Sequence, residues 1–241
     1  MSAGDRLCIA LDYGSRADAL AAARRFSGRV GWLKVGLEAF VAEGPPLVAE
    51  VAAAGRAKVF LDLKFHDIPA TVAGAVTSAA RSGAAMVNVH ASGGRAMLEA
   101  AREAATRGGL ARLIGVTLLT SIDARALADL PLAGAPEAIA RRLALLAKDC
   151  GLDGVVCSAA DLPGIRDACG PGFFTVVPGI RPAGAGVQDQ KRVATPASAL
   201  RDGADLLVIG RPVTAAPDPD AALDRILEEI GATAARRPTV T

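Results

Sequence analysis

The stretch Val59-Phe60-Leu61-Asp62-Leu63-Lys64-Phe65-His66-Asp67-Ile68-Pro69 joins a short apolar run to a cluster of charged residues. The run Val59–Leu63 is apolar toward both faces, which is typical of a strand in a parallel sheet that helices cover on both sides. An Ala-rich segment follows Thr71 and stops at Gly83, and these are start and stop signals of a helix. The stretch therefore predicts one strand–helix unit with charged side chains at the end of the strand.

The same unit recurs along the chain, with helix-capping signals such as Ser15 and Thr195-Pro196 between the strands. Two connections are longer than the others, at 118–135 and 178–194. Eight such units favour a closed (β/α)8 barrel of the α/β class over an open doubly wound sheet, and no Gly-x-Gly-x-x-Gly follows the first strand. The other seven expected strands are Leu7–Leu11, Gly31–Val35, Met86–Val89, Leu113–Thr117, Gly154–Cys157, Phe173–Val177 and Leu206–Ile209.

The composition is that of an ordinary globular chain, with 51% hydrophobic and 22% charged residues among 241. No stretch rich in Gly, Ser or Pro divides it, so we expect one barrel domain over 1–241, with a frayed tail at 232–241. Uncharged runs are shorter than the roughly 18 residues that a membrane span needs. Asp5 and Arg6 interrupt the N-terminal segment before an apolar stretch develops, which favours a cytoplasmic protein without a signal peptide.

The charge and the chemistry-bearing residues exclude several kinds of partner. A net charge of +2 and 3% aromatic residues argue against a nucleic-acid-binding surface. The four cysteines form no Cys-x-x-Cys pair, so we interpret them as idle thiols in a reducing compartment. Two histidines are too few for a His-rich zinc site. We therefore expect no nucleic acid, no membrane and no metal.

Charged residues stand where the expected strands end, and in a barrel of this kind the active site lies at those ends. Asp12 ends the first strand, and Lys34 lies near the end of the second. Asp62 and Lys64 are two apart on a strand, so they share a face. Because buried charges persist only when paired, Asp62, Lys64 and Asp67 with Lys34 would form a neutral set of alternating sign. Lysine can also give up a proton, which suggests catalysis, although a purely structural ion network remains an alternative.

The loops after the seventh and eighth expected strands indicate an anion site. Barrels often bind phosphate there, because glycines let backbone N–H groups approach and arginine binds the anion through two hydrogen bonds. The segment 181–190 is interpreted as a lid over this site, with a plain surface loop as the alternative. The residues that these loops supply are Gly179, Arg181, Gln190, Gly210 and Arg211.

Several segments, in one order and over nearly the whole chain, closely resemble the orotidine 5′-monophosphate decarboxylase family. The string Asp62-x-Lys64-x-x-Asp67-Ile68-Pro69 is the most specific of them. The segments are Ile9–Asp12, Lys34–Gly36, Leu61–Pro69, Asn88–Gly94, Gly115–Ser121, Pro178–Pro182, Asp189–Arg192 and Ile209–Pro212.

The resemblance implies a dimeric (β/α)8 carboxy-lyase of pyrimidine synthesis that makes uridine monophosphate without a cofactor or a metal. It implies that Asp12 and Lys34 hold the ribose hydroxyls of a nucleotide substrate, with Lys34 also in the charge network. It places Asp62 beside the departing carboxylate. Lys64 would protonate C6 of the pyrimidine ring.

The resemblance also assigns residues to the rest of the nucleotide. Asp67, Ile68 and Thr71 would reach into the site of the partner subunit and complete it. Thr120 would meet the edge of the pyrimidine. The phosphate would be bound by Gln190, Gly210 and Arg211, with Arg181 contributing from the side of the lid.

Two other functions remain open from the residues. One is a magnesium-dependent sugar-phosphate decarboxylase or aldolase of the same barrel superfamily, in which Asp62 and Asp67 would lie near the metal. The continuation Ile68-Pro69 and the lid residue Gln190 argue against it. The other is a noncatalytic nucleotide-binding protein.

Overall fold

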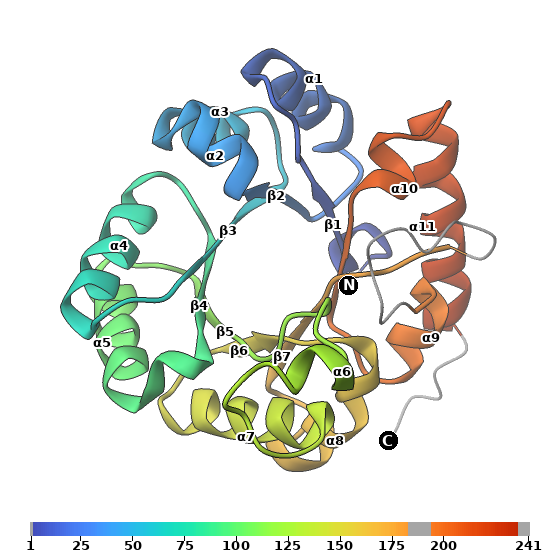
Figure 1. Cartoon of the computed structure of the whole chain (residues 1–241). Coiled ribbons are helices and arrows are strands. Elements are labelled where there is room, and N and C mark those ends of the chain that lie inside the picture. The colour runs from blue at the N-terminus through green and yellow to red at the C-terminus, as the bar shows by residue number, and fades with distance from the viewer. Residues whose placement is uncertain (1, 183–193, 236–241) are drawn as a thin grey trace.

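Eight parallel strands close into a barrel in chain order, and the helices form a ring outside it (Figure 1). The computed structural model describes residues 2–182 and 194–235. This architecture confirms the predicted (β/α)8 fold. The strands are β1 (Leu7–Ala10), β2 (Trp32–Gly36), β3 (Lys58–Phe65), β4 (Met86–His90), β5 (Arg112–Val116), β6 (Gly154–Val156), β7 (Phe174–Val177) and β8 (Leu206–Ile209).

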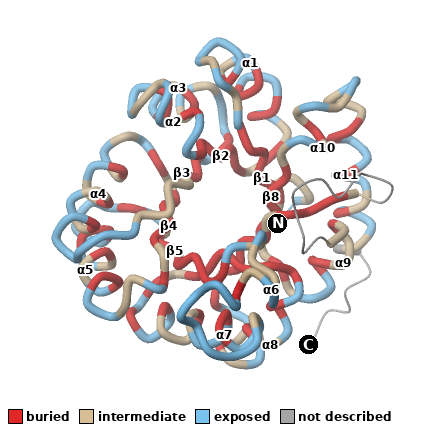
Figure 2. The backbone as a smooth tube through the Cα atoms, in the orientation of Figure 1, coloured by how far each residue is buried: buried red, intermediate tan, exposed pale blue. Residues whose placement is uncertain are grey.

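The helices that cover the barrel bury their inner faces against the strands, and exposed residues lie on the outer side (Figure 2). They are α1 (Arg16–Phe26), α2 (Leu37–Glu43), α3 (Pro45–Ala53), α4 (Pro69–Arg81), α5 (Gly94–Arg107), α6 (Ala124–Leu127), α7 (Pro136–Asp149), α8 (Leu162–Cys169), α9 (Pro196–Arg201), α10 (Arg211–Thr214) and α11 (Pro219–Ala235). Short 3-10 turns lie at Gly4–Arg6, Ala91–Gly93 and Ala159–Asp161.

The two faces of each strand pack into two separate cores. In β1, Leu7 and Ile9 belong to the large core between strands and helices, whereas Cys8 and Ala10 belong to the interior of the barrel. Alternation along the strand sends successive side chains to opposite faces, so both faces must be apolar. This is why the strands appear in the sequence as continuous apolar runs.

The predicted helix starts are right in two cases and wrong in one. The Ser15 side chain accepts a hydrogen bond from the backbone N–H of Asp18, and Thr195 forms a capping box with Ser198. Helix α4, however, begins at Pro69, so Thr71 lies inside its first turn rather than before it. The fixed φ of proline suits the first helical position, and this start signal outweighs a threonine cap two residues later.

The connection 118–135 and the end of the chain contain more regular structure than we expected, whereas most of the connection 178–194 lies outside the described residues. The connection 118–135 includes α6, and Leu118, Leu127 and Ile139 form a small core beneath it. Helix α11 continues through Ala235 into the stretch expected to fray, while 236–241 lie outside the described residues. All described strands belong to one closed barrel.

The remaining compositional expectations concern thiols and membranes. All four cysteines are buried and free. Within 2–182 and 194–235, no helix combines the length and the hydropathy that crossing a bilayer would require.

Candidate active site

A cavity of about 540 Å³ opens at the carboxyl ends of the strands. Its apolar lining comes from side chains of the barrel interior, such as Phe60, Val116 and Val156. The rest of its lining comes from strand ends, from the loops that follow them and from helices α2 and α10: Asp12, Lys34, Glu38, Asp62, Lys64, Thr120, Ser121, Gly179, Arg181, Gly210, Arg211 and Thr214. The cavity therefore lies where active sites of (β/α)8 barrels lie.

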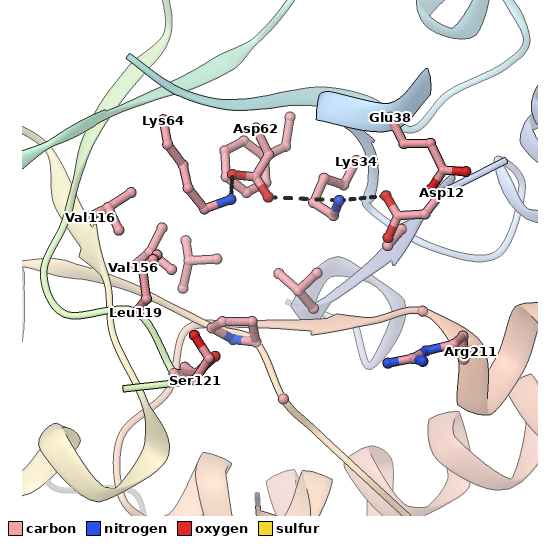
Figure 3. Close-up of a pocket in the computed structure, with 18 of the residues that line it drawn as sticks. Asp12, Lys34, Glu38, Asp62, Lys64, Val116, Leu119, Ser121, Val156 and Arg211 are labelled. Carbon is pink, nitrogen blue, oxygen red and sulfur yellow. Dashed lines mark hydrogen bonds and ion pairs between the residues drawn. The ribbon is translucent and has the colours of Figure 1, made fainter. Parts of the chain in front are cut away.

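Four side chains of alternating charge form a row along one wall of the cavity (Figure 3). Lys34 Nζ lies 2.8 Å from Asp12 Oδ1 and 3.7 Å from Asp62 Oδ2. Lys64 Nζ donates to Asp62 Oδ1 at 2.7 Å. We call Asp12, Lys34, Asp62 and Lys64 the ion row. Its two central side chains are the most buried, with exposed fractions of 10% for Lys34 and 13% for Asp62, so pairing is needed to offset their desolvation.

Neighbouring strands bring the ion row together. Parallel pairing sets Ala10 beside Lys34 and Gly36 beside Asp62, so the ends of β1, β2 and β3 meet at one edge. Gly36 makes room for the first ion pair. A Cβ atom there would lie 2.6 Å from Lys34 Nζ and 2.9 Å from Asp12 Oδ1, so any larger residue would displace the pair.

Lys64 reaches Asp62 from an irregular backbone. The pairing of β3 with β4 shifts register between Leu61 and Phe65, and Lys64 has φ of 53°. Among the described residues it is the only non-glycine residue with positive φ. Such a conformation costs about 1–3 kcal/mol. The predicted contact is present, but the regular alternation from which it was predicted is wrong, because the strand bulges at this point.

The ion row holds its central groups in their charged forms. Burial by itself would raise the pKa of Asp62, but the charges of Lys34 and Lys64 outweigh it and lower that pKa. Burial likewise would lower the pKa of Lys34, but Asp62 and Asp12 outweigh it and raise that pKa. At neutral pH Asp62 and Lys34 are therefore both ionised.

These shifts predict how the free energy of unfolding depends on pH. Because the pKa of Asp62 is lowered, its contribution is present above the pKa of an unfolded carboxyl, about 4, and is lost as pH falls through the folded pKa. Because the pKa of Lys34 is raised, its contribution is present below the unfolded pKa, about 10.4, and is lost as pH rises through the folded pKa. Urea unfolding across this range should give a plateau that declines at both ends.

Two variants check the assignment to Asp62. Asp62→Asn should flatten the acid decline, whereas Asp167→Asn, which changes an exposed carboxylate of α8, should leave it as in the wild type. If the free energy of unfolding fell equally at acid pH in the wild type and in Asp62→Asn, the assignment of this decline to Asp62 would be wrong.

Asp67 does not join the ion row of its own chain. Its carboxylate accepts a hydrogen bond from the backbone N–H of Ile68 at 2.6 Å, and it does not line the cavity. The prediction that Asp67 joins Lys34, Asp62 and Lys64 is therefore wrong within one chain. The other three side chains do meet, and the second carboxylate of the row is that of Asp12. Asp67, Ile68 and Thr71 lie instead in a continuously exposed run, 66–71.

The expected phosphate residues that the structure describes also line the cavity, and one of them, Gly210, lies beside the Asp12 end of the ion row: a Cβ atom there would be 4.0 Å from Asp12 Oδ2. Arg211 faces the cavity well away from Lys64 and Asp62 (Figure 3), and Gly179 and Arg181 line it too. The Arg181 side chain is buried, and its Nη1 donates to the carbonyl of Ile180 at 2.9 Å. Gln190 and most of the expected lid lie outside the described residues.

Sequence reasoning gave no role to some residues that the site contains. Glu38 and Ser121 line the cavity, and neither follows a strand directly. Asn88 is fully buried in β4 and donates to Asp62 Oδ1 at 2.6 Å. The available signal was a polar residue inside the apolar run Met86–Val89.

The fold and the site together define a class, that of (β/α)8 barrels with a cavity lined by acidic and basic side chains at the carboxyl ends of the strands. Comparison with known proteins narrows this class. The profile of the "Orotidine 5'-phosphate decarboxylase / HUMPS family" matches residues 5–226, so the chain belongs to that family.

Individual relatives agree with this assignment. An orotidine 5'-phosphate decarboxylase of Anaeromyxobacter sp. (strain K) is 54% identical over 92% of this chain and 96% of its own. An orotidine 5'-phosphate decarboxylase of Alkalilimnicola ehrlichii is 55% identical over 94% of this chain and 97% of its own. The crystal structure of orotidine 5'-phosphate decarboxylase from Lactobacillus acidophilus matches with a TM-score of 0.81 at 32% identity, over 94% of this chain and 99% of that one. The predicted family and the predicted enzyme class, carboxy-lyase, are confirmed.

Proposed function

We propose that this chain decarboxylates orotidine 5′-monophosphate to uridine 5′-monophosphate, a step of pyrimidine biosynthesis. The observation that carries the proposal is the ion row, which shares one cavity with two arginines and two glycines, Arg181, Arg211, Gly179 and Gly210. The names of relatives more than 50% identical to the chain support the same substrate.

The substrate would span the cavity from one wall to the other. Gly210 and Arg211, which line the cavity, would bind the phosphate together with Gln190, and Arg181 would contribute from the side of the lid. Asp12 and Lys34 would bind the ribose hydroxyls, and Thr120 the edge of the pyrimidine. This orientation directs the carboxylate on C6 toward Asp62 and Lys64. A volume of about 540 Å³ is within the range of small-molecule sites.

The reaction breaks the bond between C6 and its carboxylate carbon. Carbon dioxide leaves without the electron pair, which stays on C6, where no adjacent group accepts it. The Lys64 ammonium, already held beside Asp62, stabilises this developing charge and then donates a proton to C6. Asp62 lies where the substrate carboxylate would approach, and the repulsion between the two carboxylates ends when carbon dioxide departs.

The direct test is the loss of orotidine 5′-monophosphate absorbance in the presence of purified protein, with and without EDTA. We expect turnover that EDTA does not change. Turnover that EDTA abolishes would favour the magnesium-dependent alternative. Tight binding of the nucleotide with no change in absorbance would favour a noncatalytic binding protein.

We also propose that a second copy of the chain completes each site with Asp67, Ile68 and Thr71. All three are exposed, and Ile68, at 66% exposure, is an apolar side chain that a partner surface would cover. Leu37 and Val41 of α2 are also exposed, at 53% and 79%. Asp67 would then add a second carboxylate to the Lys64 side of the partner's ion row.

Mixing two defective variants tests the shared site. Asp67→Asn removes a charged hydrogen-bonding group worth about 2 kcal/mol, so the pure variant should lose about 30-fold in kcat/KM. Lys64→Ala alone should be inactive. In a heterodimer of the two, one site has both native residues, so unfolding and refolding an equal mixture should restore about a quarter of the wild-type activity. Activity no higher than the mean of the two pure variants would contradict the shared site.

A further inference from the structure

Asn88 contacts both halves of the Asp62–Lys64 pair without touching the cavity. It lies in the middle of β4, has no exposed surface, and is not among the cavity-lining residues. Its Oδ1 accepts a hydrogen bond from the backbone N–H of Lys64 at 2.8 Å. Its Nδ2 donates to Asp62 Oδ1 at 2.6 Å. One amide therefore binds a backbone atom of one residue and a side-chain atom of the other.

The first contact replaces a strand-to-strand hydrogen bond that the bulge removes. Leu61 pairs with Val87 and Phe65 with Val89, so three residues of β3 lie opposite Asn88 alone. The backbone carbonyls of β4 cannot accept a hydrogen bond from every backbone N–H of the bulged β3. A buried N–H without a hydrogen-bond partner costs free energy of folding. The Asn88 side chain supplies that partner and so stabilises the left-handed conformation of Lys64.

The second contact stays in place when the charge of Lys64 changes. Asp62 Oδ1 accepts from both Lys64 Nζ, at 2.7 Å, and Asn88 Nδ2, at 2.6 Å. Once the ammonium has given its proton to C6, the amine that remains holds the carboxylate less strongly. The amide of Asn88 is neutral throughout, so it keeps Asp62 in the same orientation.

We propose that Asn88 is a positioning residue: its amide sets the backbone of Lys64 and the carboxylate of Asp62 in the geometry that proton transfer requires. This inference rests on the proposed function. It implies that Asn88 affects the chemical step rather than the affinity for the nucleotide.

The test compares Asn88→Ala and Asn88→Asp with the control Thr117→Val. Thr117 is also buried at the carboxyl end of a strand, and its hydroxyl donates to the Val156 carbonyl rather than to the ion row. Asn88→Ala should lower kcat about 50-fold with KM changed less than about threefold, because misplacing a reacting group by an ångström is that costly. Thr117→Val should keep kcat within about threefold of the wild type.

Asn88→Asp gives a pH readout that a merely structural role would not give. When ionised, the carboxylate introduced at position 88 would repel the carboxylate of Asp62. When protonated, it can accept a hydrogen bond from the backbone N–H of Lys64 and donate one to Asp62, as the amide of Asn88 does. Since burial and the Asp62 charge raise the pKa of that carboxyl, its activity relative to the wild type should rise as pH is lowered. The same ratio for Asn88→Ala should not change with pH. Wild-type kcat for Asn88→Ala, or equal pH-independent ratios for both variants, would overturn the inference.

A spectroscopic measurement separates this inference from the proposed function. The chain has five lysines, so ¹³C-lysine NMR gives few signals, and Lys64→Ala identifies the one from Lys64. That signal should move in Asn88→Ala, whereas the signal of Lys58, at the other end of β3, should not. If the wild type fails to decarboxylate orotidine 5′-monophosphate, the proposed function fails. An unmoved Lys64 signal would overturn the role of Asn88 whether or not the wild type is active. If Asn88→Ala does not fold, the same NMR comparison is made with Asn88→Asp.

Discussion

Replacing Lys64 by alanine is expected to lower kcat/KM for orotidine 5′-monophosphate by at least about 10⁴-fold. Two contributions of the ammonium are lost together: the proton donated to C6 and the positive charge beside the developing carbanion. The ammonium is held 2.7 Å from Asp62 before substrate binds, so its placement needs no reorganisation during the reaction. A 10⁴-fold loss corresponds to about 5.4 kcal/mol of transition-state stabilisation. Single-turnover absorbance measurements with excess enzyme would detect the residual rate.

Lys58→Ala is the matched control for this prediction. Lys58 begins the same strand at the opposite end of the barrel, and its ammonium lies over the Trp32 ring. We expect its kcat/KM within about threefold of the wild type, since surface substitutions away from a site have small effects. An active Lys64→Ala enzyme would remove Lys64 from the role of proton donor, whatever the control shows.

Replacing Arg211 by alanine is expected to lower kcat/KM by about 150-fold, or about 3 kcal/mol, which is typical of a lost charge-assisted contact. Arg211 faces the cavity well away from Lys64 and Asp62 (Figure 3), and in the proposed orientation of the substrate it lies near the phosphate rather than C6. We therefore expect its effect to come through the phosphate, whose binding energy can support the chemical step at the reacting ring. Steady-state kinetics of the purified variant measure the change.

Substrate truncation identifies the group on which Arg211 acts. Orotidine lacks the phosphate, so wild type and Arg211→Ala should decarboxylate it at the same low rate. Arg225→Ala, which removes an exposed arginine of α11, should leave kcat/KM for the full substrate unchanged. If Arg211→Ala impaired orotidine as strongly as the nucleotide, the phosphate assignment would be wrong.

The sequence predicts the barrel well because the signal for each strand is local. A strand buried on both faces must be apolar along its whole length, and Leu206–Ile209, for example, has the predicted bounds. The positions of charged residues at strand ends follow once the strands are found. Hence Asp12, Lys34, Asp62 and Lys64 could be assigned to one cavity before their contacts were known.

Features that depend on register or on another chain could not be predicted in this way. A period of two says which residues share a face, but it does not report the bulge that gives Lys64 its positive φ. Asn88 was left without a role for the same reason, because its contacts arise only opposite that bulge. For Asp67 the sequence offers spacing alone, and spacing does not say whether the carboxylate faces its own cavity or a neighbour's.

The left-handed conformation of Lys64 bears on how this position can change over evolutionary time. Glycine would adopt φ of 53° without strain, so a mutation to glycine would relieve an energetic burden that lysine imposes on the folded chain. Losing the amine would, however, take from the buried Asp62 carboxylate its partner at 2.7 Å, so the ion pair opposes the exchange. That lysine occupies this position despite its backbone strain is what one expects where turnover depends on the amine, and it identifies a site at which conformational strain and ionic pairing act in opposite directions.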